Sequence, residues 1–163
     1  MSKMIKILFV CHGNICRSPM AEFVMKDLVL RAGLEAQFEI ASAATSTEEI
    51  WNGHGNPIYP PVQSEMRRHG LGRTPYTDFS GKRARQVTKE DLGYYDYILC
   101  ADRNNIANTL RITGPDKAGK VRLLLEYTGE PRAIADPWYT GDFARTWQDV
   151  CEGCEAFLRH IGK

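Results

Sequence analysis

The sequence predicts a single-domain α/β protein with a doubly wound, four-stranded parallel sheet and helices on both faces. The chain has 163 residues, which is the length of one ordinary domain. Strand-like apolar runs alternate with amphipathic stretches along the chain, the pattern of a parallel sheet with helical crossovers. The first run, at residues 4–10, is apolar almost throughout, as expected for a central strand that is buried on both faces.

The strands are expected at residues 4–10, 38–42, 95–100 and 121–125. The first helix should begin with Ser18 as N-cap and Pro19 at its first position, and should run to about residue 31. Further helices are expected at about 61–69, just after the capping-box spacing at 88–91, after an Asp102 N-cap, and at about 142–161.

Composition and charge exclude several classes of protein. Hydrophobic residues make up 43% and charged residues 25% of the chain, as in soluble globular proteins. The 21 Lys and Arg nearly balance the 20 Asp and Glu, so no broad basic surface for nucleic acid is expected. The short apolar start is too short for a membrane helix or a secretory core. Five widely spaced cysteines do not form a disulfide framework, which favours a cytoplasmic protein, and a monomer is expected.

Ligands of such flavodoxin-like sheets bind beyond the carboxyl ends of the strands. Four loops should therefore meet at that edge: residues 11–17, residues 42–55, the helix start at Asp102, and the long loop that contains Asp136.

The loop that follows the first strand has the composition of an anion site. Cys11 and Arg17 flank it, and a helix begins at its end, so backbone N–H groups and a guanidinium can converge on a phosphoryl group. Gly13 and Asn14 tolerate the positive φ that such a ring of amides requires. The positive surroundings should favour the Cys11 thiolate, which is a nucleophile. The spacing alone could arise by chance, but its place between strand and helix supports a catalytic loop.

If the Cys11 thiolate attacks a phosphate ester, the alcohol or phenol that leaves needs a proton. The water that later releases phosphate from the cysteine must in turn lose a proton. Asp136 is the candidate for both roles, because it lies in the last long loop and Pro137 stiffens the backbone after it. Trp138 and Tyr139 could wall an aromatic substrate pocket, although they could instead belong to the core.

The segments V-C-H-G-N-I-C-R-S-P-M-A-E at 10–22 and D-P-W-Y at 136–139 closely resemble the low-molecular-weight protein tyrosine phosphatases, and the likeness spans nearly the whole chain. It implies that Cys11 is the nucleophile, Arg17 the phosphate clamp and Asp136 the general acid. The loop residues that should contact substrate are His12, Gly13, Asn14, Ile15, Cys16 and Ser18.

The resemblance further implies a hydrogen-bonded shell around the phosphate loop, formed by Asn14, Ser18, Ser42 and His69. The Ser18 hydroxyl would help the thiol to leave. Cys16 would be either a reversible disulfide partner of Cys11 or a buried filler.

Other placements stay open. His12 could tune the thiolate, line the entrance of the pocket or be a partly exposed loop residue without a role. Trp51 is placed as a pocket wall, in a stretch, 47–55, whose length and composition vary in the family. Cys100, Cys151 and Cys154 are expected to be packing residues rather than metal or redox groups.

The predicted function is cysteine-dependent hydrolysis of phosphotyrosine in proteins or peptides, without metal or other cofactor. Rival readings are a thiol-coupled arsenate reductase, for which a closely spaced cysteine pair after the third strand is missing, and a protein-arginine phosphatase, against which Ile15 argues because such members carry threonine there. A phosphotyrosine-binding module without turnover would have no reason to keep Cys11, Arg17 and Asp136 together.

Overall fold

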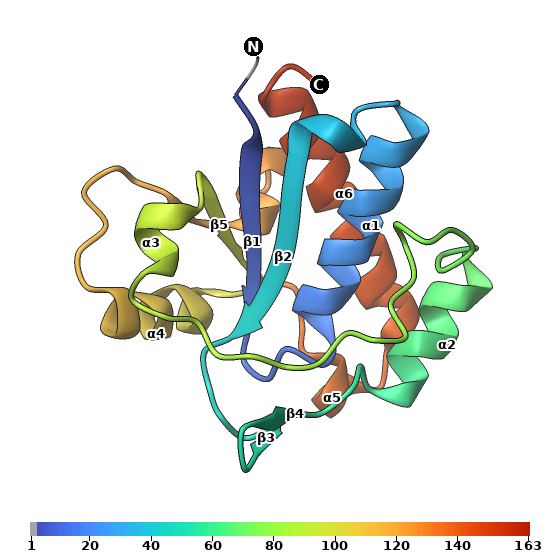
Figure 1. Ribbon diagram of the computed structural model, residues 1–163, viewed down its shortest axis with the longest axis horizontal. Helices are drawn as coiled ribbons and strands as arrows, with labels where there is room; N and C mark the ends of the chain where they lie inside the picture. The colour runs from blue at the N-terminus through green and yellow to red at the C-terminus, as the bar shows by residue number, and fades with distance from the viewer. Residues whose placement is uncertain (1–2) are drawn as a thin grey trace.

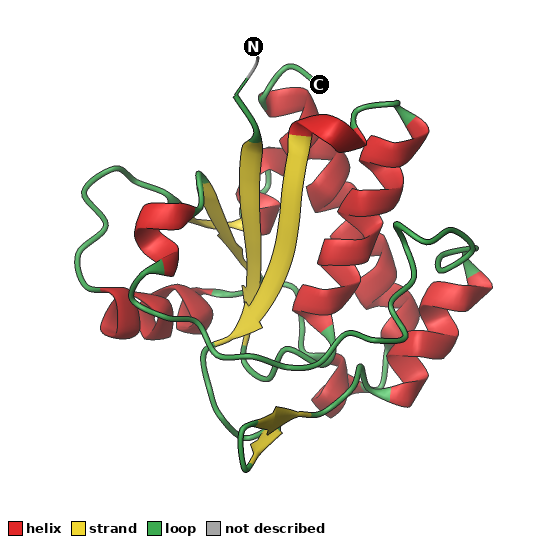
Figure 2. Ribbon diagram, viewed as in Figure 1, coloured by secondary structure: helices red, strands yellow, loops and turns green. Residues whose placement is uncertain are grey.

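A computed structural model describes residues 3–163. The four strands of the main sheet are parallel and lie in the order β2-β1-β5-β6. Their bounds are β1 Ile5–Cys11, β2 Phe38–Ala44, β5 Tyr97–Cys100 and β6 Val121–Leu123. The predicted fold class is confirmed, because helices cover both faces of this sheet (Figure 2).

The helices form two layers around the sheet. In Figure 1, α1, α2 and α6 lie on one side of the sheet, and α3 and α4 lie on the other. Their bounds are α1 Arg17–Arg31, α2 Pro60–Arg68, α3 Asp91–Tyr94, α4 Arg103–Thr113, α5 Pro137–Thr140 and α6 Phe143–His160. Within residues 3–163, no helix has both the length and the apolar composition that crossing a bilayer requires.

Strand β1 lies between β2 and β5, and its side chains alternate between the two faces of the sheet, so it contributes to the core on both sides. Ile7 and Phe9 pack in the apolar cluster beneath α1 and α6, whereas Leu8 and Val10 pack in the cluster on the α4 side. All four side chains are at most 1% exposed. The unbroken apolar run that predicted a central strand therefore reflects burial on both sides.

Two local predictions need correction, and a third is confirmed. Helix α1 begins at Arg17 with Cys16 as N-cap, so Ser18 is not the cap and its hydroxyl is free for other contacts. Strand β6 ends at Leu123, and Leu124–Thr128 form a 3-10 helix instead of extending the strand. The Asp102 cap on α4 is confirmed, with Asn105 completing a capping box.

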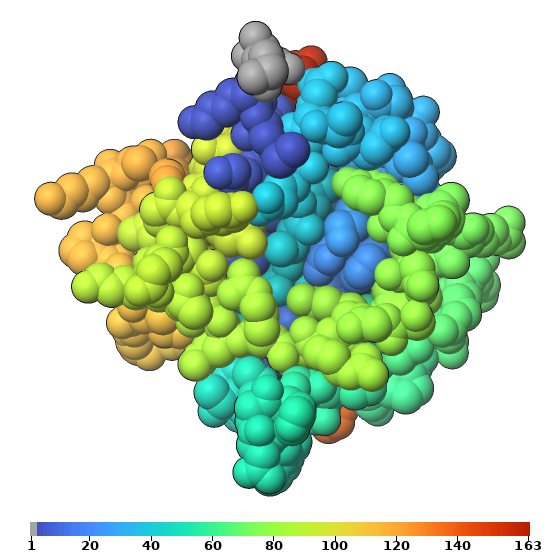
Figure 3. Space-filling model, in the orientation of Figure 1, coloured from blue at the N-terminus to red at the C-terminus, as the bar shows by residue number. Residues whose placement is uncertain are grey.

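The loops meet at the carboxyl edge of the sheet, as predicted. In Figure 1, the phosphate loop after β1, the hairpin of β3 (Ile50–Trp51) and β4 (His54–Gly55), and helix α5 all lie at the end of the molecule opposite to the termini. The long segment between α2 and α3 passes in front of β2, the edge strand of the sheet, and Gln86 bridges to Ala44 there (Figure 1). Figure 3 shows this segment in green to yellow-green over the front of the molecule.

Candidate active site

The loop at residues 12–16 turns tightly between β1 and α1 and surrounds the Cys11 thiol. Asn14 has a left-handed backbone with φ 60°, one of the few conformations that allow successive N–H groups to face one ligand. Its backbone N–H donates to Cys11 Sγ at 3.3 Å, and Ser18 Oγ lies 3.0 Å from the same sulfur. The sulfur therefore has hydrogen-bonding partners on the side away from the pocket.

The Arg17 side chain is 4% exposed and is held by groups from two other loops. Its Nη1 donates to Asp102 Oδ2 at 2.8 Å and to the Ile134 carbonyl at 2.9 Å, and its Nη2 lies 3.5 Å from Asp136 Oδ2. The buried Nε of Arg17 has no hydrogen-bond partner among residues 3–163, so it remains available to an anion. Burial alone would lower the pKa of Arg17, but Cys11 and the Asp102 hydrogen bond outweigh it and raise the pKa.

Asp136 is held at the start of helix α5. As N-cap, its Oδ1 accepts a hydrogen bond from the Trp138 N–H at 3.1 Å, and Pro137 occupies the first helical position. Its side chain is 26% exposed, so the carboxyl group faces both Arg17 and the open pocket. A carboxyl group placed in this way can exchange protons with a ligand on Arg17.

These groups border a cavity of about 290 Å³. It is lined by Cys11, His12, Gly13, Ile15, Cys16, Arg17, Glu48, Glu49, Asp136, Trp138 and Tyr139. Trp138 is 53% exposed and packs on Tyr59 with ring centroids 4.8 Å apart, whereas Tyr139 is 84% exposed. The cavity therefore has a polar floor with a buried cation and an aromatic mouth.

Two acidic residues, Glu48 and Glu49, also line the cavity. His12 Nε2 lies 3.0 Å from Glu48 Oε2, which links the phosphate loop to the segment before β3. The Asn56 side chain donates to Glu49 Oε2 at 3.3 Å. Sequence reasoning singled out neither glutamate, because an acidic pair in a loop of variable length carries no distinctive signal.

Two residues that the sequence analysis placed near the site lie elsewhere. Trp51 is 69% exposed on β3, opposite His54, and does not line the cavity. His69, just after α2, stacks on Trp147 with ring centroids 4.1 Å apart and forms no hydrogen bond with the phosphate loop. The shell behind the loop therefore differs from the prediction at His69.

The remaining shell residues do come together. Asn14 Nδ2 donates to Ser18 Oγ at 2.8 Å and to Ser42 Oγ at 3.0 Å, which joins the phosphate loop, α1 and β2. Glu22 and Lys82 complete this cluster next to Ser42, in the region where the sequence analysis had expected His69.

Asp102 also has a larger role than sequence reasoning assigned to it. The same carboxylate caps α4 and accepts from Arg17, one oxygen for each partner. The sequence could have indicated this role, because Asp102 comes just after β5 and ligands of parallel sheets bind beyond the carboxyl ends of the strands.

All five cysteines are free thiols. Cys16 is buried beside Cys11, and burial is the main cause that raises the pKa of its thiol. Burial likewise raises the pKa of Cys100 to about 12 and of Cys151 to about 12. Within residues 3–163, no group of three or more His, Cys, Asp or Glu side chains could hold a metal ion.

Comparison with known proteins agrees with this architecture. The family model for low molecular weight phosphotyrosine protein phosphatase matches residues 6–163. The protein-tyrosine-phosphatase YfkJ of Bacillus subtilis is 38% identical over 98% of this chain and 97% of its own length, and the human low molecular weight phosphotyrosine protein phosphatase is 40% identical over 93% and 92%.

Solved structures give the same result. The crystal structure of YfkJ superimposes with a TM-score of 0.87 over 98% of this chain and 96% of that chain, at 37% identity. A Drosophila arginine phosphatase superimposes with a TM-score of 0.83 over 98% and 100%, at 29% identity.

The fold and the cavity define a single-domain α/β enzyme in which Cys11 and Arg17 flank the loop between the first strand and the first helix. The chain belongs to the low molecular weight phosphotyrosine protein phosphatase family.

Proposed function

We propose that this enzyme hydrolyses phosphotyrosine in peptides or proteins through a phosphocysteine intermediate on Cys11. The observation that carries the proposal is the placement of Cys11 and Arg17 at one cavity whose other wall is Asp136. Cys11 and Arg17 flank one loop and Asp136 comes from a distant part of the chain; together they supply a nucleophile, a clamp and a proton donor.

In the first step, the Cys11 thiolate attacks phosphorus while the bond between phosphorus and the tyrosine oxygen breaks. The loop amides and the Arg17 guanidinium, including its unpartnered Nε, stabilise the charge on the three equatorial oxygens. Asp136 gives its proton to the departing phenolate.

In the second step, a water molecule attacks the phosphocysteine. Asp136, now a carboxylate, takes a proton from that water, the bond between phosphorus and sulfur breaks, and inorganic phosphate leaves. The Ser18 hydroxyl, 3.0 Å from the sulfur, stabilises the returning thiolate.

The aromatic mouth favours phosphotyrosine over phosphoserine. Trp138 and Tyr139 lie above the anion site, where they can contact a substrate ring whose phosphate reaches Cys11. A phosphoserine side chain has no ring to make that contact.

The experiment is phosphate release from phosphotyrosine, phosphoserine and phosphoarginine peptides in reducing buffer, with wild type and Cys11→Ser. Selective turnover of phosphotyrosine that disappears in Cys11→Ser is the expected result. Full activity of Cys11→Ser would refute the covalent mechanism. Preferential release from phosphoarginine would assign the specificity of the Drosophila neighbour to this chain and refute the argument from Ile15.

A further inference from the structure

The residue directly after the nucleophile is titratable and lies in the substrate cavity. His12 lines the cavity, and its Nε2 lies 3.0 Å from Glu48 Oε2. Both side chains also meet solvent, since the His12 side chain is 45% exposed and that of Glu48 is 71% exposed. The pair therefore lies at the open end of the cavity, whereas the buried Arg17 lies at its floor.

Backbone hydrogen bonds hold the segment before β3 against the phosphate loop. The Thr45 N–H donates to the Cys11 carbonyl and the Ser46 N–H donates to the His12 carbonyl, each at 3.0 Å. The loop that follows β2 is therefore fixed on the loop that follows β1, and Glu48 is held at the edge of the cavity.

Glu49 is held on the phosphate loop by packing. A Cβ at Gly13 would lie 3.2 Å from Glu49 Cγ, so the aliphatic part of Glu49 lies directly on this glycine. The Glu49 carboxylate accepts from the Asn56 side chain at 3.3 Å. Two glutamates thus line the cavity, and within residues 3–163 His12 is the one side chain that forms an ion pair with either of them.

The charge at the open end of the cavity depends on the protonation of His12. A neutral imidazole and an imidazolium can both donate through Nε2, so the contact with Glu48 survives loss of the proton. Imidazole groups lose their proton between about pH 5 and 8. At the acidic end of this range the pair is neutral, and Glu49 alone contributes a negative charge. At the alkaline end, Glu48 and Glu49 both contribute one.

We propose that His12, through its protonation, sets how strongly the enzyme selects basic residues next to phosphotyrosine. The proposal rests on the proposed function, which puts the phosphate at Cys11 and Arg17. The residues that flank phosphotyrosine in a peptide then pass the open end of the cavity, where the two glutamates lie. A flanking Lys or Arg is attracted there and a flanking Asp or Glu is repelled, and both effects grow when His12 loses its proton.

The other titratable side chains of the cavity do not have this role. They are Cys11, Cys16, Arg17, Asp136 and Tyr139. Cys11, Arg17 and Asp136 act on the phosphate, which every phosphotyrosine peptide has in common. Burial is the main cause that raises the pKa of the Cys16 thiol, which therefore stays neutral below pH 8. Phenol groups are neutral in the same range.

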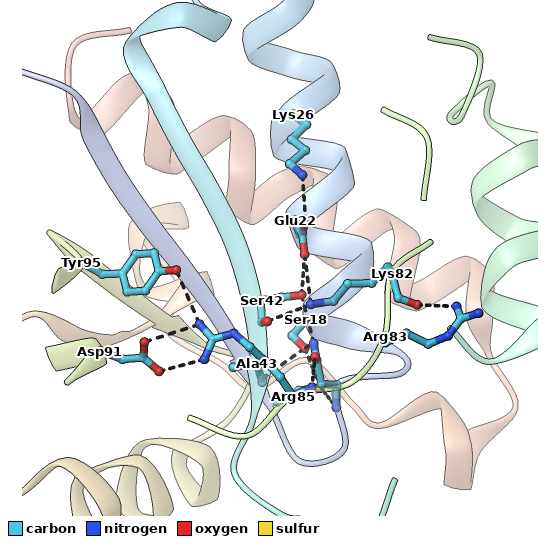
Figure 4. Close-up of polar contacts among 12 residues, drawn as sticks. Ser18, Glu22, Lys26, Ser42, Ala43, Lys82, Arg83, Arg85, Asp91 and Tyr95 are labelled. Carbon is cyan, nitrogen blue, oxygen red and sulfur yellow. Dashed lines mark hydrogen bonds and ion pairs between the residues drawn. The ribbon is translucent and has the colours of Figure 1, made fainter. Parts of the chain in front are cut away.

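The charged groups behind the phosphate loop do not reach a bound peptide. Figure 4 shows Glu22, Lys26 and Lys82 beside α1 and β2. The Glu22 carboxylate lies 2.9 Å from Lys26 Nζ and 3.6 Å from Lys82 Nζ, and its side chain is 6% exposed. None of these three residues lines the cavity, so their charges do not distinguish one flanking residue from another.

The test is the binding of three peptides that carry a non-hydrolysable phosphonate analogue of phosphotyrosine, flanked on both sides by Lys, Gln or Glu. Fluorescence anisotropy gives the dissociation constants between pH 5.5 and 8. The readout is the dissociation constant of the Glu-flanked peptide divided by that of the Lys-flanked peptide, because ionisation of the phosphonate and of its binding groups affects both alike. In wild type this ratio should exceed one and should rise about five-fold from pH 5.5 to 8.

His12→Gln separates the titration of His12 from that of every other group. The amide can still donate to Glu48 but carries no charge, so the ratio should keep its alkaline wild-type value over the whole pH range. His54→Gln is the matched control, because His54 is an exposed histidine on β4 that does not line the cavity. It should keep the full rise of the wild-type ratio.

Glu48→Gln tests the carboxylate of the pair. The ratio should fall about five-fold at every pH, because one negative charge is lost, and its rise with pH should remain, because His12 still titrates. A wild-type ratio that does not rise with pH, or that rises equally in His12→Gln, would overturn the proposal. An unchanged ratio in Glu48→Gln would overturn it as well, through a variant in a different loop.

These measurements need no hydrolysis. Turnover that survives Cys11→Ser would refute the proposed mechanism and leave the selectivity ratio standing. Equal binding of the three peptides by an enzyme that hydrolyses phosphotyrosine would refute the role of His12 alone. Failure of all three peptides to bind would refute both.

Discussion

The guanidinium of Arg17 donates a 2.8 Å hydrogen bond to Asp102, and the same carboxylate caps helix α4 through its other oxygen. The Arg17 side chain is therefore oriented by the end of a helix on the opposite face of the sheet from α1, the helix on which Arg17 lies. Because the Arg17 side chain is almost fully buried, its direction depends on such fixed partners and not on solvent.

Asp102→Asn separates the two roles of this residue. Asparagine caps helices as well as aspartate does, so the variant should keep nearly the wild-type melting temperature. Its NH₂ group would face the guanidinium once the amide oxygen caps α4, and kcat/KM should fall about ten-fold. Asp142→Asn changes the equivalent cap of α6, which does not line the cavity, and should leave kinetics unchanged. A normal kcat/KM in Asp102→Asn would show that Arg17 needs no such partner.

Asp136→Asn should lower turnover according to the leaving group. Asparagine keeps the α5 cap but has no proton to give, so kcat/KM for a phosphotyrosine peptide should fall by about 10² to 10³. An aryl phosphate with a strongly acidic phenol should lose much less in kcat/KM, because that leaving group departs without protonation. Rapid-quench measurement should show phosphocysteine accumulating with the second substrate, since water activation is also lost. Equal losses for both substrates would argue against a proton-transfer role.

Local sequence patterns were sufficient to predict those strands and helices whose own residues form an apolar run or a helix cap. The apolar run of β1 predicted a central strand, and Asp102 predicted the start of α4. The β3–β4 hairpin was missed although its turn is Asn52-Gly53, both with positive φ, and Asn-Gly is a strong hairpin signal. The Asn-Gly dipeptide alone was therefore enough to predict this hairpin from the sequence.

The polar shell behind the phosphate loop could not be predicted from local patterns. Lys82 reaches Glu22 across sixty positions of sequence, and its spacing from other residues says nothing about that contact. His69 has the residue type expected near a phosphate loop, but Trp147 on α6 offers its ring a stacked position. Which of two polar residues enters such a shell depends on the path of the segment between α2 and α3, which follows no periodic pattern.

Stability should decline at alkaline pH because of Cys100. Burial raises the pKa of this thiol from 9.0 to about 12, so between these values the unfolded chain has lost a proton that the folded chain keeps. The unfolded state then binds fewer protons, and the free energy of unfolding falls as pH rises, by up to about 1.4 kcal/mol per pH unit. Below pH 9 the thiol contributes no slope.

Guanidinium unfolding at pH 8 to 11 measures this effect. Cys100→Ala loses packing at every pH, so the slope and not the absolute stability is the readout. The variant should show a shallower decline than wild type above pH 9. Identical slopes would mean that the Cys100 thiol ionises equally in the folded and unfolded states.

Gly153 in the middle of α6 should not tolerate alanine, although alanine favours helices. A Cβ there would lie 2.7 Å from Leu124 Cγ and 3.0 Å from Leu125 Cδ2, in the tight contact between α6 and the 3-10 helix after β6. The clash should cost about 1 to 3 kcal/mol in free energy of unfolding. Gly93 in α3 is the matched control, because a Cβ there meets nothing within 4 Å, and Gly93→Ala should be stabilising by about 0.5 to 1 kcal/mol. Chemical denaturation of both variants decides the matter: a stabilised Gly153→Ala would mean that the two leucines move apart at little cost.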